Sequence, residues 1–229
     1  MDGAHYHTPS LEPFEVVFQD IVDNPQMRNI SSFRLELSCL ETNTGAVCAL
    51  ARKALRHSLN VTDLAIPADF LEPSHPLFRV VSYLQLLEGW STAPILARIR
   101  LQRLQVSMLG RLDMEESTTP CLLPHLKHLD LRDCEQFPML LLQQLDLPNI
   151  RSLKVRNMLM NSKLIDKQLT SLVLTVPWLK LIKSFTLNEA RVSEVTLLWT
   201  LGRLPLLIDS DLLHRRSPTG RLWHYCGSL

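Results

Sequence analysis

The stretch between residues 123 and 158 contains one apolar pattern twice, and this duplication limits the folds that the chain can adopt. In the first copy the apolar residues are Leu126, Leu129 and Leu131. The second copy repeats their spacing 24 residues later, at Ile150, Leu153 and Val155. Each copy predicts a short strand, and the stretch 137–145 between them has the length of a helical return. Neither unit can bury its apolar side alone, so the pattern predicts stacked units with parallel strands.

Together with Cys134, the first copy matches the leucine-rich repeat template L-x-x-L-x-L-x-x-(N/C). Fitting this template elsewhere predicts repeats that start at residues 30, 61, 96, 126, 150, 169 and 192. The third register stays open, because a start at Leu101 fits as well as one at Leu96. Apolar spacing predicts helices over 44–57 and 77–87. The predicted fold class is α/β, an irregular leucine-rich-repeat solenoid with a curved parallel sheet and outer helices.

The same pattern divides the chain. We expect residues 1–24 to form an N-terminal tail and a short helix, residues 25–215 to form the solenoid, and residues 216–229 to form a C-terminal tail. Leucine makes up about one residue in five, roughly twice the usual share, which suits a fold whose repeats are built on leucine.

Charge and cysteine content restrict the partners and the compartment. The chain has 24 Lys and Arg against 23 Asp and Glu, so no global field favours nucleic acid or an anionic membrane. Five cysteines without a C-x-x-C spacing suggest reduced thiols, and the N-terminal residues lack the pattern of a secretory signal. No run of about 18 apolar residues predicts a membrane span. We therefore expect a cytoplasmic or nuclear protein.

Three sequence segments resemble a known family, and they are LPHLKHLDLRDC at 123–134, FPMLLLQQLDLPNIRSLKV at 137–155 and QLTSLVL at 168–174. They resemble the irregular leucine-rich repeats of fungal F-box-like proteins. In that family the repeats select a substrate, while an N-terminal F-box docks onto the adaptor of a cullin-type ubiquitin ligase. Residues 1–29 hold at most one short helix, so the resemblance implies substrate recognition and ubiquitin-ligase partners without a visible F-box. A truncated product without selected function is an alternative.

Motifs for catalysis are missing from the sequence. It contains no G-x-x-x-x-G-K-[ST], no G-x-S-x-G and no H-E-x-x-H, so we expect neither an enzyme nor a cofactor. The alternative is a metal-dependent enzyme that uses four residues suited to zinc, which are Cys121, His125, His128 and Cys134. The triplet at 209–211 reads D-x-D, but we interpret it as the N-cap of a following helix.

Strand geometry supplies the candidate site. If the leucine and isoleucine positions face the core, the residues between them point to the concave face of the sheet. The expected binding surface is a basic stripe made of Arg98, Arg100, His128, Arg132, Lys154 and Arg156. Because arginine and lysine suit carboxylates and phosphates, the stripe predicts a non-catalytic module that binds an acidic or phosphorylated protein.

Overall fold

The fold was obtained as a computed structural model, which describes residues 19–20, 22–24, 29–34, 44–57, 60–66, 80–86, 100–107, 121–133, 139–156, 162–188, 192–213 and 224–228. The strands of the large sheet are β1 (Ser32–Arg34), β2 (Asp63–Ile66), β3 (Tyr83–Leu86), β4 (Arg103–Ser107), β6 (His128–Arg132), β8 (Ser152–Arg156), β9 (Ser184–Asn188), β10 (Asp209–Leu213) and β11 (His224–Ser228). A smaller sheet contains β5 (Cys121–Leu122) and β7 (Leu145–Asp146). The helices are α2 (Thr44–His57), α4 (Met139–Gln144), α5 (Ser162–Thr175), α6 (Glu194–Leu201) and the 3-10 helix η4 (Pro177–Leu181).

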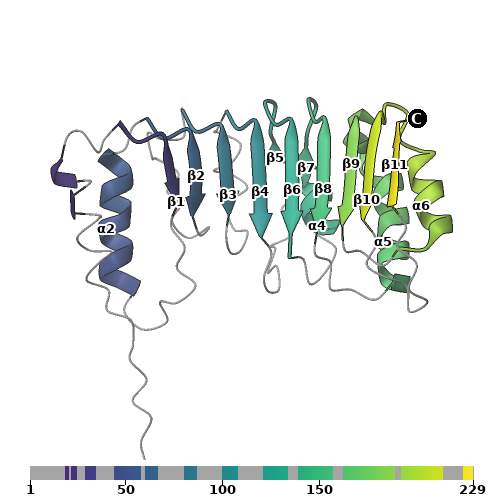
Figure 1. The fold of residues 1–229 in the computed structure, drawn as a ribbon, viewed down its shortest axis with the longest axis horizontal. Coiled ribbons are helices and arrows are strands. Elements are labelled where there is room, and N and C mark those ends of the chain that lie inside the picture. The colour runs from purple at the N-terminus through teal and green to yellow at the C-terminus, as the bar shows by residue number, and fades with distance from the viewer. Residues whose placement is uncertain are drawn as a thin grey trace, which may run out of the picture.

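The large sheet has the order β1-β2-β3-β4-β6-β8-β9-β10-β11, so its strands follow one another along the chain (Figure 1). Neighbouring strands are parallel except for β10 and β11, which pair antiparallel. In Figure 1, α4 and α5 lie behind the strands, and α2 lies beside β1 at the opposite end of the sheet from α6. The predicted α/β class with a mostly parallel sheet is thus confirmed.

Buried apolar side chains form three columns across this sheet. The first column is Phe33, Leu64, Leu84, Leu104, Leu129, Leu153 and Phe185. The second, two residues later in each strand, is Ile66, Leu86, Val106, Leu131, Val155 and Leu187. The third precedes the strands and contains Val61, Val81, Leu101, Leu126, Ile150, Ile182 and Leu207. These columns are the L-x-x-L-x-L pattern in three dimensions, since residues two apart on a strand share one face.

A repeated hydrogen bond joins each unit to the next. One carbonyl just before each strand accepts two consecutive backbone N–H groups from the following unit, over distances of 2.7 to 3.1 Å. The accepting residues are Ser31, Thr62, Ser82, Gln102, Lys127, Arg151 and Lys183. The backbone therefore repeats its geometry even where the number of residues between strands varies.

Proline marks several of the turns that lead into the strands. In the segments that begin at Leu123, Leu147 and Leu204, the carbonyl of the first residue accepts a bond from the N–H three residues later, over 3.1 to 3.3 Å. Proline is the second residue of all three turns, where its fixed φ suits a β-turn.

Several predicted elements hold, and others are wrong. The strands expected after residues 30, 61, 126 and 150 are present as β1, β2, β6 and β8, and the helix over 44–57 is α2. The third register is the later one, because Leu104 and Val106 lie in β4. The expected helix over 77–87 is wrong in its described part, since residues 83–86 form β3.

The last two predicted strands are also wrong. The sixth and seventh repeats, expected at 169 and 192, lie in α5 and α6, and the strands of this region are β9 and β10. The triplet at 209–211 begins β10 and is not a helix N-cap. β11 lies within the stretch where a C-terminal tail was expected, and it extends the sheet. Among the described residues no helix has the length and apolar content that crossing a membrane requires.

Candidate binding face of the sheet

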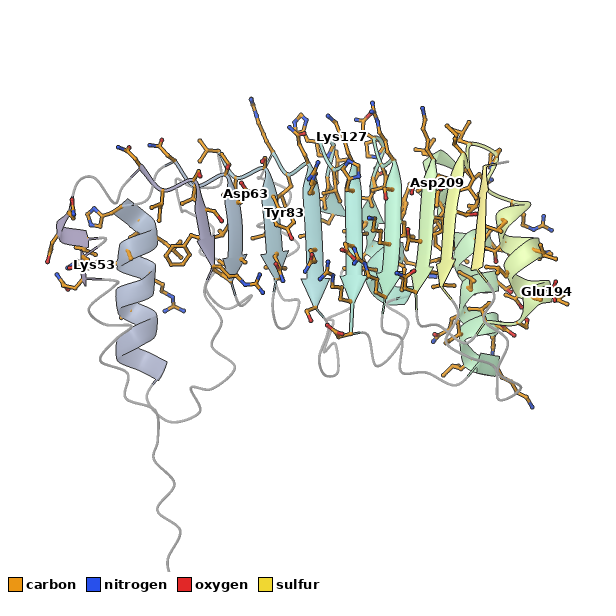
Figure 2. All side chains as sticks on the ribbon, viewed as in Figure 1. Lys53, Asp63, Tyr83, Lys127, Glu194 and Asp209 are labelled. Atoms are coloured by element: carbon orange, nitrogen blue, oxygen red, sulfur yellow. The ribbon has the colours of Figure 1, made fainter. Side chains whose placement is uncertain are left out.

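The residues that alternate with the buried columns form the second face of the sheet, which we call the open face. Its first row is Ser32, Asp63, Tyr83, Arg103, His128, Ser152, Ser184 and Asp209. Figure 2 labels Asp63, Tyr83 and Asp209 along this row. The second row contains Arg34, Ala65, Gln85, Gln105, Asp130, Lys154 and Thr186, and the third contains Ser107, Arg132, Arg156 and Asn188. Charge gathers over β4, β6 and β8, which contribute four cations and one carboxylate to the open face.

The structure brings together four of the six predicted site residues. His128 and Arg132 project from β6, and Lys154 and Arg156 project from the neighbouring β8. Arg100 does not belong to the open face: it lies in the segment before β4, because the third repeat uses the later register. The remaining predicted residue, Arg98, falls outside the described residues.

Arg103 is a site residue that the sequence analysis missed. It begins β4, is exposed and stands next to His128 in the register of the sheet. The signal was present, because the alternative start at Leu101 places Arg103 between two buried residues of the template. The earlier register, which starts at Leu96, instead predicts Arg98 and Arg100 as the cations of this strand.

Asp130 forms ion pairs with two cations of the open face, Arg132 and Arg156. Its Oδ2 atom accepts hydrogen bonds from Arg132 Nε at 3.3 Å, Arg132 Nη2 at 3.1 Å and Arg156 Nη2 at 2.7 Å. The Asp130 side chain is only 16% exposed, whereas those of Arg132 and Arg156 are 35% and 29% exposed. Asp130 therefore offsets one of the two positive charges and holds both guanidinium groups in place.

Next to these two ion pairs, the open face contains a hollow. The hollow has a volume of about 390 Å³ and is lined by Tyr83, Arg103, Leu104, Gln105, His128, Leu129, Asp130, Ser152 and Lys154. One of its walls is fixed by a hydrogen bond, since the Tyr83 hydroxyl donates to Gln105 Oε1 at 3.0 Å. Burial raises the pKa of Tyr83 above its ordinary value of 10.0, so the hydroxyl keeps its proton at neutral pH.

His128 lies among several positive charges. Partial burial is the main cause that lowers the pKa of its imidazole below 6.5, and the charges of Arg103 and Lys154 lower it further, followed by those of Lys127 and Arg151. Figure 2 shows Lys127 at the edge of the sheet where β6 begins. The imidazole is therefore neutral at pH 7, and the hollow has the positive potential that attracts an anion.

The residues of the alternative zinc hypothesis are spread over different parts of the fold. Cys121 is buried on β5, His125 is exposed in the turn before β6, and His128 lies on the open face. Within the described ranges no three His, Cys, Asp or Glu side chains are placed to hold a metal ion. Cys134, the fourth residue of the hypothesis, lies outside those ranges.

Comparison of this chain with protein-family models, with curated proteins and with solved structures finds no match. The function has to be inferred from the open face itself.

Proposed function

We propose that this chain is an irregular leucine-rich-repeat solenoid that binds another protein without catalysis, and that its open face is the concave face of the solenoid. Three continuous apolar columns and the repeated carbonyl hydrogen bond support a fold made of equivalent stacked units. Solenoids bind partners on extended surfaces built from the outward residues of successive repeats. The open face is the surface of this kind in the present chain.

One observation carries the functional proposal: Arg103 of β4 and Lys154 of β8 line one hollow from either side of β6. Adjacent strands are about 4.8 Å apart, so one extended segment can touch Arg103, His128 and Lys154 together. Arginine and lysine recognise carboxylate and phosphate groups, and partial desolvation in a hollow strengthens such pairs. The expected partner is a protein with an acidic or phosphorylated segment.

The resemblance to fungal F-box-like repeats extends this proposal to a cellular role. In that role the module would select a substrate for a cullin-type ubiquitin ligase in the cytoplasm or nucleus. An affinity purification of the chain from its native cell tests the extension, because ligase subunits should then be recovered with it. Recovery of an acidic partner without any ligase subunit would retain the binding function and remove the ligase role.

The binding proposal is tested by selecting peptide ligands and reversing charges. A display library of random 15-residue peptides is selected on the wild-type chain, and the peptides recovered are measured against two double variants. Arg103→Glu with Lys154→Glu reverses two charges at the hollow. Lys167→Glu with Lys180→Glu reverses two exposed charges on α5 and η4. Arg156 is left intact because a glutamate there would oppose Asp130 and disturb the fold.

We expect the selected peptides to be acidic, to lose binding to the hollow variant and to keep binding to the control variant. Their binding to the wild type should weaken as salt rises, since these ion pairs are partly exposed. Circular dichroism of both variants confirms that they are folded. Selected peptides that are not acidic, or that bind both variants equally, would contradict the proposal.

A further inference from the structure

We infer that the hollow binds a phosphate monoester on a side chain of the partner, an inference that rests on the proposed function and specifies its ligand. An acidic segment can present carboxylates or phosphates, and the two groups differ in charge and shape. A phosphate monoester carries between −1.5 and −2 charges at pH 7 and has three acceptor oxygens. A carboxylate carries one charge and has two oxygens in a plane. The arrangement of groups around the hollow favours the larger anion.

The two cations of the hollow stand on opposite sides of β6. Arg103 belongs to β4 and Lys154 to β8, two strand spacings away and two residues further along the strands, so their backbones are about 12 Å apart. Long side chains from both sides can meet one anion between them. No described carboxylate forms an ion pair with Arg103 or Lys154, in contrast to Arg132 and Arg156, which Asp130 holds. These two cations are therefore available for a ligand.

Neutral hydrogen-bonding groups line the hollow together with the two cations. His128 lies on β6 between the strands of the two cations, and Ser152 lies on the strand of Lys154. The Tyr83 hydroxyl reaches Gln105 on the strand of Arg103. A tetrahedral anion can direct separate oxygens to Arg103, to Lys154 and to one of these groups. Two coplanar carboxylate oxygens reach fewer of them at once.

Asp130 lowers the attraction of the hollow for any anion but does not reverse it. Its carboxylate lies in the lining of the hollow and repels any anion that enters. Coulomb energy scales with the charge of the ligand, so repulsion and attraction both double for a dianion. The cations outnumber the acid, and the net attraction therefore also grows with ligand charge. A phosphate gains more from this site than a carboxylate does.

The test uses three degenerate peptide libraries that differ only at one central position, which is phosphoserine, glutamate or serine. Fluorescence anisotropy compares their binding to the wild type, to Arg103→Gln with Lys154→Gln, and to the control Lys167→Gln with Lys180→Gln. A fluorescent single-stranded RNA of mixed sequence is measured alongside. We expect the phosphoserine library to bind at least about tenfold more tightly than the glutamate library, the factor of one added charge-assisted hydrogen bond. The hollow variant should lose this preference, and the control should keep it.

The possible failures separate the two proposals. If the glutamate and phosphoserine libraries bind equally and both lose binding to the hollow variant, the phosphate inference is overturned and the acidic-segment function stands. If the hollow variant binds all libraries like the wild type, both proposals are overturned. Tighter binding of the RNA than of the phosphoserine library would overturn the assignment to a protein partner.

A second readout does not depend on variants. In the wild-type chain, NMR follows the His128 imidazole while inorganic phosphate is added at pH 7.5. An anion seated beside His128 should shift this signal in a saturable manner, and sodium chloride at equal ionic strength should not reproduce the shift. Equal shifts with both salts would overturn the seating of phosphate in the hollow.

Discussion

Leu129 is the position at which the register of the sheet can be tested most sharply. Its side chain is 1% exposed in β6, between Leu104 of β4 and Leu153 of β8. Leu129→Ala removes three carbons, worth about 2.4 kcal/mol at roughly 0.8 kcal/mol each. Both strand neighbours are held in the hydrogen-bonded sheet and cannot close the space. The cavity term therefore raises the expected loss of unfolding free energy to about 3–5 kcal/mol.

Leu164→Ala is the matched control, because it makes the same chemical change at a position that is 46% exposed on α5. Because the side chain is half exposed, only about half of the free energy of removing it from water is lost there, and little cavity forms. We therefore expect the unfolding free energy to fall by about 1 kcal/mol or less. His128→Ala, one residue from Leu129 but on the open face, should cost about 0.5 kcal/mol or less.

Urea unfolding followed by circular dichroism measures all three variants. We expect a large fall in midpoint for Leu129→Ala at an unchanged slope, and small shifts for the other two. An unchanged midpoint for Leu129→Ala, or an equal loss in Leu164→Ala, would refute the assignment of Leu129 to the buried column.

Three further predictions concern polar groups. Asp130→Asn leaves two guanidinium groups without their shared charge, and urea unfolding should show a loss of about 1–2 kcal/mol, kept small because both groups are partly exposed. Thr200 is 1% exposed and its Oγ1 has no partner among the described residues, so Thr200→Val should raise the unfolding free energy by about 1 kcal/mol; a loss of stability would show that the hydroxyl is satisfied. NMR titration should give His128 a pKa below 6.5, and Lys154→Gln should raise it by removing a positive neighbour. The pKa of His128 is lower in the folded chain than in the unfolded chain, so the unfolded chain takes up the proton more readily. The stability from this histidine is therefore present above pH 6.5 and is lost as pH falls through the folded pKa. His128→Gln should reduce this loss of stability at low pH.

Much of the sheet could be predicted because its pattern depends on local spacing. Where polar residues separate the apolar ones, as in Leu126–Leu131 and Ile150–Val155, each strand was placed correctly. The two misplaced strands, at 169 and 192, came from leucine-rich helices that also contain the spacing. In the stretch 169–174, Val173 is buried although the strand template points it outward, and Leu174 is 67% exposed although the template buries it. Burial at three- and four-residue intervals marks a helix instead.

The strands β9 and β10 also have a signal in the sequence. Ile182, Phe185 and Leu187 have the template spacing with only polar residues between them. Ile182 precedes β9, and Phe185 and Leu187 lie within it. Leu204-Pro205 repeats the turn that precedes β6 and β8, and it leads into β10. The weaker match at β10 has a physical basis, since buried Ser210 occupies the column that other strands fill with leucine or phenylalanine.

The site was predictable only in part. Alternation placed His128, Arg132, Lys154 and Arg156 on one face, because strand periodicity alone decides which side a residue takes. It could not show that Asp130 holds both arginines, since that depends on side-chain conformations and distances. The hollow likewise follows from the relative sizes of side chains on four strands, which no single-strand pattern contains.

Site-specific photo-crosslinking tests most directly whether the open face binds the partner. A photoreactive amino acid is placed at Gln85 of β3 or Ser184 of β9, on either side of the three strands β4, β6 and β8, and at Lys167 of α5 as the control. The probe is an acidic or phosphoserine peptide selected on the wild-type chain. We expect crosslinks from positions 85 and 184 that excess unlabelled peptide suppresses, and none from position 167. Crosslinks from position 167 alone would place binding on the helices and contradict the account.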